Sequence, residues 1–229
     1  MAIKYLVGLD RDDTLNLDKL TYFGVEPNWK ELLKIIDGVY EGLKKLSAHP
    51  EVALAVVTNQ VGIAKGKFDE QRVIEINEYM DELFKEEGIK IDSWQYSPYS
   101  DKKGAQRWKD KGVKNINWNY ILEDDDLRLQ LIKPNDGMMR KACEEIGADY
   151  NQLEKYIIGD STSDAKAAIQ AGGTGIIVTH PEIKEGKNAR YQAPKIEEMM
   201  QDPQYEGKVH WIHSMVDAAD LILEEIQRI

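Results

Sequence analysis

Two carboxylates two positions apart follow a short apolar run near the start of the chain. Asp10 and Asp12 stand where a buried strand over residues 5–9 is expected to end. Side chains alternate between the faces of a strand, so positions 10 and 12 point the same way if the extended geometry persists. A divalent cation and a reacting phosphoryl group would offset the repulsion between them. The segment 10–14 fits equally well an acidic turn whose side chains cap the next helix.

Three further segments carry residue types that phosphate chemistry needs, each beside an expected strand or helix. The residues are Thr58 and Asn59 after the apolar run 52–57, Lys133 ahead of the helical stretch 137–146, Asp160 after the apolar run 156–158, and Asp164 at the start of the helix that follows. A hydroxyl, an amide, an ammonium and further carboxylates are the groups that bind phosphate oxygens and a metal ion. Their order along the chain favours the chemical interpretation of the first segment.

Together the four segments resemble the motifs of the haloacid dehalogenase superfamily. The resemblance is closer to one branch, the histidinol-phosphate and heptose-bisphosphate phosphatases, which borders on polynucleotide 3'-phosphatases. The matching residues are Asp10-Arg11-Asp12 with Thr14 and Asn16, Thr58-Asn59-Gln60, Gly62-Ile63-Ala64, Gly66, Lys133-Pro134 and Gly137-Met138. Such matches run along most of the chain, and as a set they are specific although each alone is weak.

The resemblance implies a phosphatase that acts through an aspartyl-phosphate. Asp10 is expected to attack phosphorus, and Asp12 to give a proton to the leaving group and later take one from water. Lys133 is the third expected catalytic residue, since its ammonium neutralises charge in the transition state. The expected substrate-binding residues are Thr58, Asn59 and Asn16. The substrate class is a small phosphorylated metabolite such as a sugar, polyol or histidinol phosphate.

One Mg²⁺ ion is the expected cofactor. Its expected ligands are Asp10, the main-chain carbonyl of Asp12, and Asp160. Asp164 is expected to support the metal through a water molecule or through a hydrogen bond to Lys133, and a role as a helix-capping acid is equally consistent with its position.

Three departures from the branch pattern bear on function. Asp13 replaces a glycine that usually forms a tight turn, and Ile132 replaces an arginine before the motif lysine. Many members carry a zinc loop of cysteine and histidine, but this chain has one cysteine, Cys143, which lies beyond Lys133. No structural zinc is therefore expected. The corresponding region, about 98–132, is instead a long insertion rich in aromatic and charged residues.

Composition agrees with one globular domain over residues 1–229. The chain has 42% hydrophobic and 31% charged residues, and its net charge of −11 argues against a general nucleic-acid binder. Residues 102–114 are nevertheless basic and contain a tryptophan, which would suit a single nucleic-acid strand. We interpret the insertion as a solvated lid. A polynucleotide 3'-phosphatase and a catalytically lapsed phosphate-binding module remain the alternatives.

Alternating strands and helices predict a doubly wound, Rossmann-like parallel α/β sheet. Helices are expected over 29–46, 69–87, 137–146, 163–171 and 214–229, strands over 5–9, 52–57, 93–97, 156–158 and 175–178, and an irregular segment over about 180–213. No apolar stretch has membrane-spanning length, and the start of the chain has no signal-peptide core. We therefore expect a cytoplasmic protein with no membrane partner, while its oligomeric state stays open.

Overall fold

The core of the protein is a six-stranded sheet in which every strand is parallel to its neighbours. The computed structural model describes residues 2–18, 22–180 and 187–228. The strand order is β3-β2-β1-β6-β7-β8. The bounds are β1 (Tyr5–Leu9), β2 (Val52–Asn59), β3 (Ser93–Ser97), β6 (Glu154–Gly159), β7 (Thr174–Val178) and β8 (Val209–Ile212).

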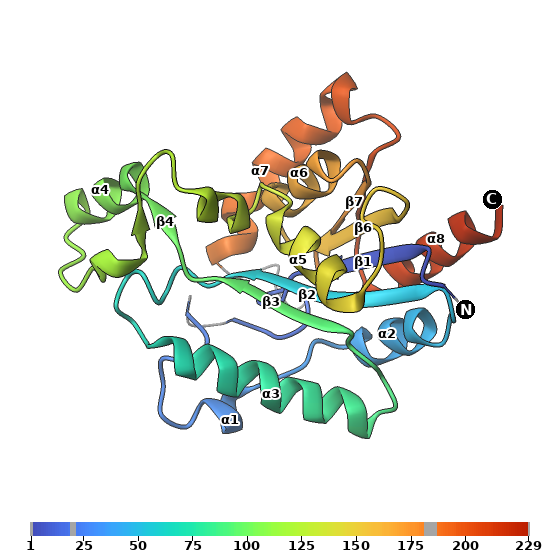
Figure 1. Cartoon of the computed structure of the whole chain (residues 1–229), viewed down its shortest axis with the longest axis horizontal. Coiled ribbons are helices and arrows are strands. Elements are labelled where there is room, and N and C mark those ends of the chain that lie inside the picture. The colour runs from blue at the N-terminus through green and yellow to red at the C-terminus, as the bar shows by residue number, and fades with distance from the viewer. Residues whose placement is uncertain (1, 19–21, 181–186, 229) are drawn as a thin grey trace.

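Helices cover both faces of this sheet. Tyr5, Val7 and Leu9 of β1 pack with α2 (Val39–Ser47), α3 (Glu70–Glu86) and α8 (Met215–Arg228). Leu6 faces the other way and packs with α5 (Gly137–Ile146) and α6 (Thr162–Gln170), and α7 (Lys187–Gln201) packs against α6 and β7 on this side. Figure 1 shows α6 and α7 on one side of the strands and α2 and α3 on the other. The predicted doubly wound fold is confirmed.

The order of the strands creates a crevice at the centre of the sheet. From β1 the chain moves outward through β2 to β3, and it then returns to the other side of β1 and moves outward from β6 to β8. The carboxyl ends of β1 and β6 are therefore neighbours, with Leu9 paired to Ile158. In open α/β sheets ligands bind at such a reversal of strand order. The residues that follow these two strands thus face one binding site.

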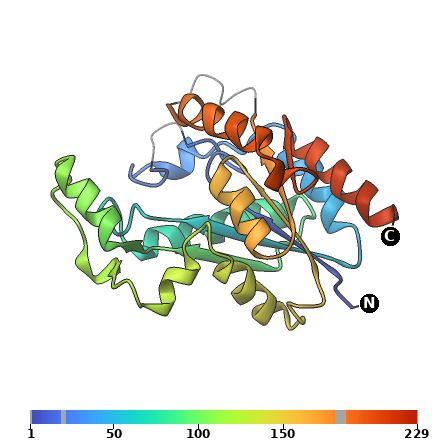
Figure 2. The same ribbon diagram turned by 90° about the horizontal axis from the view of Figure 1, so that it is seen from above.

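The insertion forms a small lobe of its own between β3 and α5. It contains a two-stranded sheet of β4 (Ser100–Asp101) and β5 (Ile121–Leu122), the helix α4 (Lys102–Asp110), and the 3-10 helices η1 (Trp118–Tyr120) and η2 (Leu127–Leu131). In Figures 1 and 2 the lobe projects at the end of the molecule opposite the N-terminus. Since β1 starts near the N-terminus, the lobe lies at the carboxyl end of the sheet.

The helix predicted over 29–46 is wrong as a single element. The structure has a short α1 (Trp29–Leu32) and then α2, separated by extended residues. Ile35 forms a bridge with Asn16 of the loop after β1, and Gly38 has φ = 84°. A left-handed residue ends helical geometry, and pairing with the loop takes up the backbone groups that a helix would use.

The segment 180–213 is expected to be irregular, but its part over 187–213 contains regular structure, while 181–186 lie outside the described residues. Helix α7, the 3-10 helix η4 (Pro203–Tyr205) and the edge strand β8 all fall within it. Pro194 lies inside α7, and the prolines and glycines of this segment obscured the pattern. No helix in the described ranges combines the length and apolar character needed to cross a membrane.

Candidate active site

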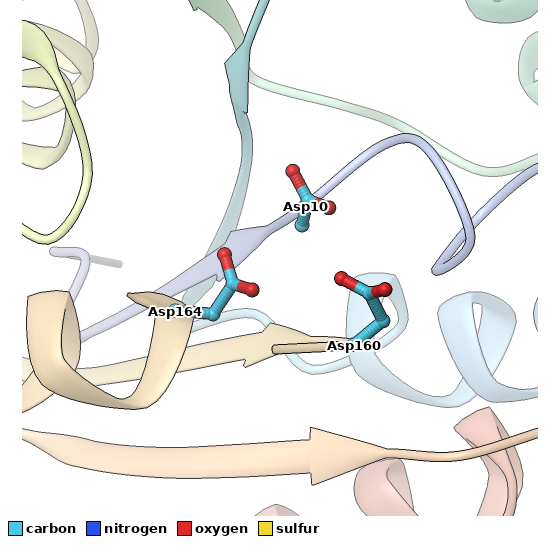
Figure 3. A group of neighbouring side chains, drawn as sticks. All are labelled: Asp10, Asp160 and Asp164. Carbon is cyan, nitrogen blue, oxygen red and sulfur yellow. The ribbon is translucent and has the colours of Figure 1, made fainter. Parts of the chain in front are cut away.

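Three carboxylates converge where the strand order reverses. Asp10 follows β1, Asp160 follows β6 and Asp164 lies in the first turn of α6. One oxygen from each lies within 4.8 Å of the others. Figure 3 shows the three side chains pointing toward one another from these elements. Asp10 and Asp164 are buried and Asp160 is partly buried. The structure thus brings together residues that are 150 positions apart in the sequence.

Lys133 lies within this cluster. Its Nζ is 2.6 Å from an oxygen of Asp10 and 2.6 Å from an oxygen of Asp164, and only 4% of its side chain is exposed. The backbone amide of Lys133 donates to Oδ1 of Asn59 at 3.0 Å, and the Asn59 side chain donates to the Lys133 carbonyl at 3.2 Å. The end of β2 therefore fixes the position of the lysine. Lys133 and Asp164 thus form an ion pair, while the support of a metal ion by Asp164 stays a prediction.

Asp164 also caps the helix on which it lies. Its Oδ2 accepts from the backbone amide of Ser161 at 3.2 Å, and the Ser161 side chain accepts in return from the backbone of Asp164, which together form a capping box. The Ser161 hydroxyl also donates to Oδ2 at 2.5 Å. Gly159 makes room for it, because a Cβ at residue 159 would lie 2.2 Å from Cγ of Asp164. Asp164 thus caps the helix through Oδ2 and pairs with the Lys133 ammonium through Oδ1.

The cluster holds more negative charge than Lys133 can neutralise. Burial raises the pKa of Asp10 against the attraction of Lys133, and burial with repulsion from Asp10 and Asp164 raises the pKa of Asp160 well above its ordinary value. Burial lowers the pKa of Lys133, but attraction to the two carboxylates outweighs it. Three oxygen donors with excess negative charge fit a hard divalent cation such as Mg²⁺.

Asp12 is held directly by Arg11 and Gln60, and Asn77 in turn holds Arg11. Arg11 is fully buried, and its Nε and Nη2 donate to the two oxygens of Asp12 at 3.1 and 3.0 Å. Its Nη1 donates to Asn77 of α3 at 2.9 Å. Gln60 Nε2 lies 2.8 Å from Asp12 and 2.9 Å from the hydroxyl of Thr58. Gln60 thus links Asp12 to Thr58.

Sequence reasoning missed Arg11, Gln60 and Asn77 as parts of the site. Arg11 and Gln60 lie inside the quoted motifs, and that position was the only signal available. Asn77 lies in the middle of an amphipathic helix, where nothing in the local pattern separates it from a solvated polar residue. Its burial and its contact with Arg11 depend on the packing of α3 against the loop after β1.

Asn16 is completely buried in the loop that follows β1. Its backbone carbonyl accepts from Asp13 at 2.7 Å, and its backbone amide donates to Arg11 at 3.1 Å. The structure therefore places Asn16 where it shapes the loop that carries Asp12. Its binding of substrate stays a prediction.

Asp13 occupies the glycine position of the branch pattern without breaking the turn. Its φ of 61° lies in the left-handed region, which aspartate tolerates better than most residues. Its Oδ1 accepts from the backbone amide of Asp18 at 2.9 Å. A glycine adopts this turn because it has no side chain to hinder it, whereas Asp13 is held in the turn by a hydrogen bond across the loop. Aspartate at this position is therefore compatible with an intact site.

A cavity of about 680 Å³ opens beside Lys133. Ile132, the residue in the arginine position, lies in its wall, as do Asn59 and several residues of the inserted lobe. The volume falls within the usual range of small-molecule sites, about 300–1,000 Å³. A small molecule in this cavity would thus be next to the carboxylate cluster.

The sequence of the chain is similar to those of known proteins. The sequence profile described as HAD-hydrolase-like matches residues 131–199. A D-glycero-beta-D-manno-heptose-1,7-bisphosphate 7-phosphatase from Haemophilus influenzae is 35% identical over 164 residues, which cover 71% of this chain and 74% of that protein. The protein of the same name from Pasteurella multocida is 30% identical, covering 86% and 95% of the two chains.

Solved structures show the same fold. A D,D-heptose 1,7-bisphosphate phosphatase from B. bronchiseptica, complexed with magnesium and phosphate, aligns with a TM-score of 0.66 at 21% identity and covers 96% of this chain and 99% of that one. A HAD-like phosphatase structure from Mesorhizobium loti aligns with a TM-score of 0.59 at 25% identity, covering 78% and 74% of the chains. The chain therefore belongs to the haloacid dehalogenase superfamily, and it is a phosphoric monoester hydrolase of that superfamily.

Proposed function

We propose that this protein is a Mg²⁺-dependent phosphatase that hydrolyses a phosphate monoester of a small sugar-like metabolite through an aspartyl-phosphate at Asp10. The observation that carries the proposal is the convergence of Asp10, Asp160, Asp164 and Lys133 at the reversal of strand order. Relatives named for a phosphorylated sugar support the substrate class.

The proposed metal ligands are the carboxylates of Asp10 and Asp160 and the main-chain carbonyl of Asp12, with Asp164 beside them. Bound Mg²⁺ would cancel the repulsion between these groups and an incoming phosphate dianion. The raised pKa values of Asp10 and Asp160 support this, because burial and repulsion between the carboxylates disfavour their charged forms and a bound cation would favour them. The B. bronchiseptica structure was complexed with magnesium and phosphate.

In the first chemical step, an oxygen of Asp10 forms a bond to phosphorus as the ester P–O bond breaks. Asp12 gives its proton to the departing alkoxide, and in the second step it takes one from the water that attacks phosphorus. Phosphate then leaves and the Asp10 carboxylate is regenerated. Lys133 stabilises negative charge on the transferred group.

The loops beside the cluster have distinct parts in the proposal. Arg11 and Gln60 hold the Asp12 carboxylate at a defined position, which proton transfer in both steps requires. The Thr58 hydroxyl and the backbone amide of Asn59 would bind phosphoryl oxygens. Catalytic lapse, one of the alternatives, is disfavoured because Asp13 and Ile132 leave this machinery intact.

The proposal is tested by measuring phosphate release from sugar, polyol, histidinol, nucleotide and 3'-phosphorylated oligonucleotide substrates, with MgCl₂ or with EDTA. We expect turnover of a small metabolite that needs Mg²⁺ and is lost in Asp10→Asn. Asp125→Asn, which alters an exposed carboxylate of the inserted lobe, is the matched control and should retain activity. Turnover that persists in Asp10→Asn would refute the proposed nucleophile, and preference for the oligonucleotide would favour the polynucleotide phosphatase.

A further inference from the structure

Helix α3 carries a polar residue on the face that it buries against the core. Asn77 is buried, and the other buried residues of this helix are all apolar: Val73, Ile76, Met80 and Phe84. A leucine at position 77 would continue the apolar stripe, whereas a buried amide destabilises a fold unless it forms a hydrogen bond. The partner of Asn77 therefore indicates why the amide is there.

This partner is Arg11, a charged residue with no exposed surface. Oδ1 of Asn77 accepts from Nη1 of Arg11 at 2.9 Å, and it is the one hydrogen-bond acceptor of that nitrogen among the residues that the structure describes. Nε and Nη2 of Arg11 donate to the two oxygens of Asp12. All three nitrogens of the planar guanidinium thus have an acceptor, which fixes its orientation.

Arg11 and Asn77 hold Asp12 from the interior of the protein. The side chain of Arg11 is 0% exposed, whereas that of Asp12 is 23% exposed and is accessible to small molecules. Stability does not explain this arrangement, because a buried charged pair can often be replaced by apolar residues without loss of stability. What the arrangement does provide is a single orientation of the Asp12 carboxylate, since both of its oxygens are held by one rigid group.

Helix α3 has a second polar contact that involves neither Arg11 nor Asp12. Glu70, its first residue, accepts from Tyr96 of β3 at 2.8 Å and from Tyr120 of the inserted lobe at 3.0 Å. Glu70 precedes Asn77 by seven positions, which is about 10 Å along the helix axis. The two polar contacts of α3 can therefore be removed one at a time.

We infer that Asn77 is a positioning residue for proton transfer by Asp12. By accepting from Nη1 it fixes the Arg11 guanidinium, which in turn fixes the carboxylate that gives a proton to the leaving group and later takes one from water. Without this acceptor a buried N–H of Arg11 has no partner, so the guanidinium shifts and the carboxylate shifts with it. This inference rests on the proposed phosphatase function, and it adds a residue from outside the motifs of the sequence.

The test compares two kinds of ester that differ in their need for a proton. The departing alkoxide of a sugar or polyol phosphate must be protonated, whereas p-nitrophenyl phosphate releases a stable anion. The alkyl ester is whichever of glucose 6-phosphate, fructose 6-phosphate and sorbitol 6-phosphate the wild type hydrolyses fastest. The measured quantity is kcat/KM, because it reports only the steps up to the departure of the leaving group.

Asn77→Leu should lower kcat/KM for the alkyl ester about tenfold, as expected for one lost hydrogen bond to a charged group. Its kcat/KM for p-nitrophenyl phosphate should change much less, so the ratio of the two values changes. A merely structural role of Asn77 would lower both values together. Equal loss for both esters, or no loss, would overturn the inference while leaving the phosphatase function standing.

Three control variants separate the contact with Arg11 from other effects on α3. Asn77→Asp keeps an acceptor oxygen and should restore the wild-type ratio. Ile76→Val shortens a buried side chain in the same turn, and Tyr120→Phe removes a hydrogen bond to Glu70. Neither changes a hydrogen bond of Arg11, so both should keep the wild-type ratio. A change in the ratio in Ile76→Val as large as that in Asn77→Leu would contradict the inference.

Nuclear magnetic resonance supplies a second measurement that does not depend on turnover. The Nε–H signal of Arg11, identified by its loss in Arg11→Lys, should exchange slowly with solvent in the wild type because the group is buried and bonded to Asp12. Asn77→Ala, which removes the acceptor without adding bulk, should speed this exchange about tenfold, and Asn77→Asp should not. Unchanged exchange in Asn77→Ala would contradict the inference. Absence of any turnover that needs Mg²⁺ and Asp10 in the wild type would instead refute the proposed function.

Discussion

Replacement of Lys133 by methionine should expose the electrostatic imbalance of the site. The ammonium lies 2.6 Å from oxygens of both Asp10 and Asp164 and is almost fully buried. Removing one partner from a buried ion pair costs about 3–5 kcal/mol, because a charge is left uncompensated. For a chain of this size, 1 kcal/mol corresponds to about 2–4 °C in Tm. We therefore expect Lys133→Met to lower the Tm by about 6–20 °C in EDTA.

Magnesium should restore a large part of this loss. A ligand that binds only the folded state stabilises it by mass action, and a divalent cation at the carboxylates would replace the missing positive charge. The assay is thermal unfolding followed by circular dichroism, in EDTA and in excess MgCl₂. The Tm gain on adding MgCl₂ should be larger for Lys133→Met than for the wild type. Phosphatase activity of the variant should nevertheless fall by about 10²-fold or more, as for the loss of an oxyanion donor.

Lys155→Met is the matched control, because Lys155 is also buried but forms no ion pair with a carboxylate in the described part of the chain. Its Nζ donates to the carbonyls of Tyr150 and Leu153 at 2.9 and 2.6 Å. Burial lowers the pKa of Lys155. The difference between this variant and the wild type should be the same with and without Mg²⁺. A Lys133→Met protein as stable in EDTA as the wild type, or with the same Mg²⁺ response, would refute the reasoning.

Three further variants test other parts of the site. Asp160→Asn should raise the Tm in EDTA and abolish the Mg²⁺ response. The pKa of Asp160 in the folded protein lies above its ordinary value of 3.8, so its charge destabilises the metal-free wild type at pH values above the folded pKa. This destabilisation is relieved as the pH falls from the folded pKa toward 3.8. In urea unfolding at a series of pH values, the free energy of unfolding should therefore rise less on acidification in the variant than in the wild type. Gln60→Leu removes a hydrogen bond to Asp12 and should lower kcat about tenfold with little change in KM, and an unchanged kcat would exclude a positioning role. Gly159→Ala forces its Cβ against Asp164 and should cost about 1–3 kcal/mol together with the Mg²⁺ response, checked by unfolding with and without MgCl₂.

Local sequence patterns determined most of the fold. Helices predicted over 69–87 and 137–146 and the strand over 93–97 agree with α3, α5 and β3 to within one residue at each end. Their periodicity is a property of neighbouring residues, so it can be read without knowledge of the rest of the chain. The prediction failed at residues 33–38, where pairing of Ile35 with Asn16 outweighs a helical pattern, and at the edge strand β8 with α7, where prolines and glycines hide the periodicity.

The sequence by itself also determined the residue types at the ends of β1, β2 and β6 and ahead of α5, and so the nature of the chemistry: they are Asp10, Thr58, Asp160 and Lys133. Only the tertiary structure decided how they meet. Three sets of contacts join residues far apart in the chain. The Lys133 ammonium bridges Asp10 and Asp164, Gln60 contacts Asp12, and Asn77 contacts Arg11. Such contacts depend on the packing of helices against a common sheet, and a local pattern contains no information about the distance between two separate elements.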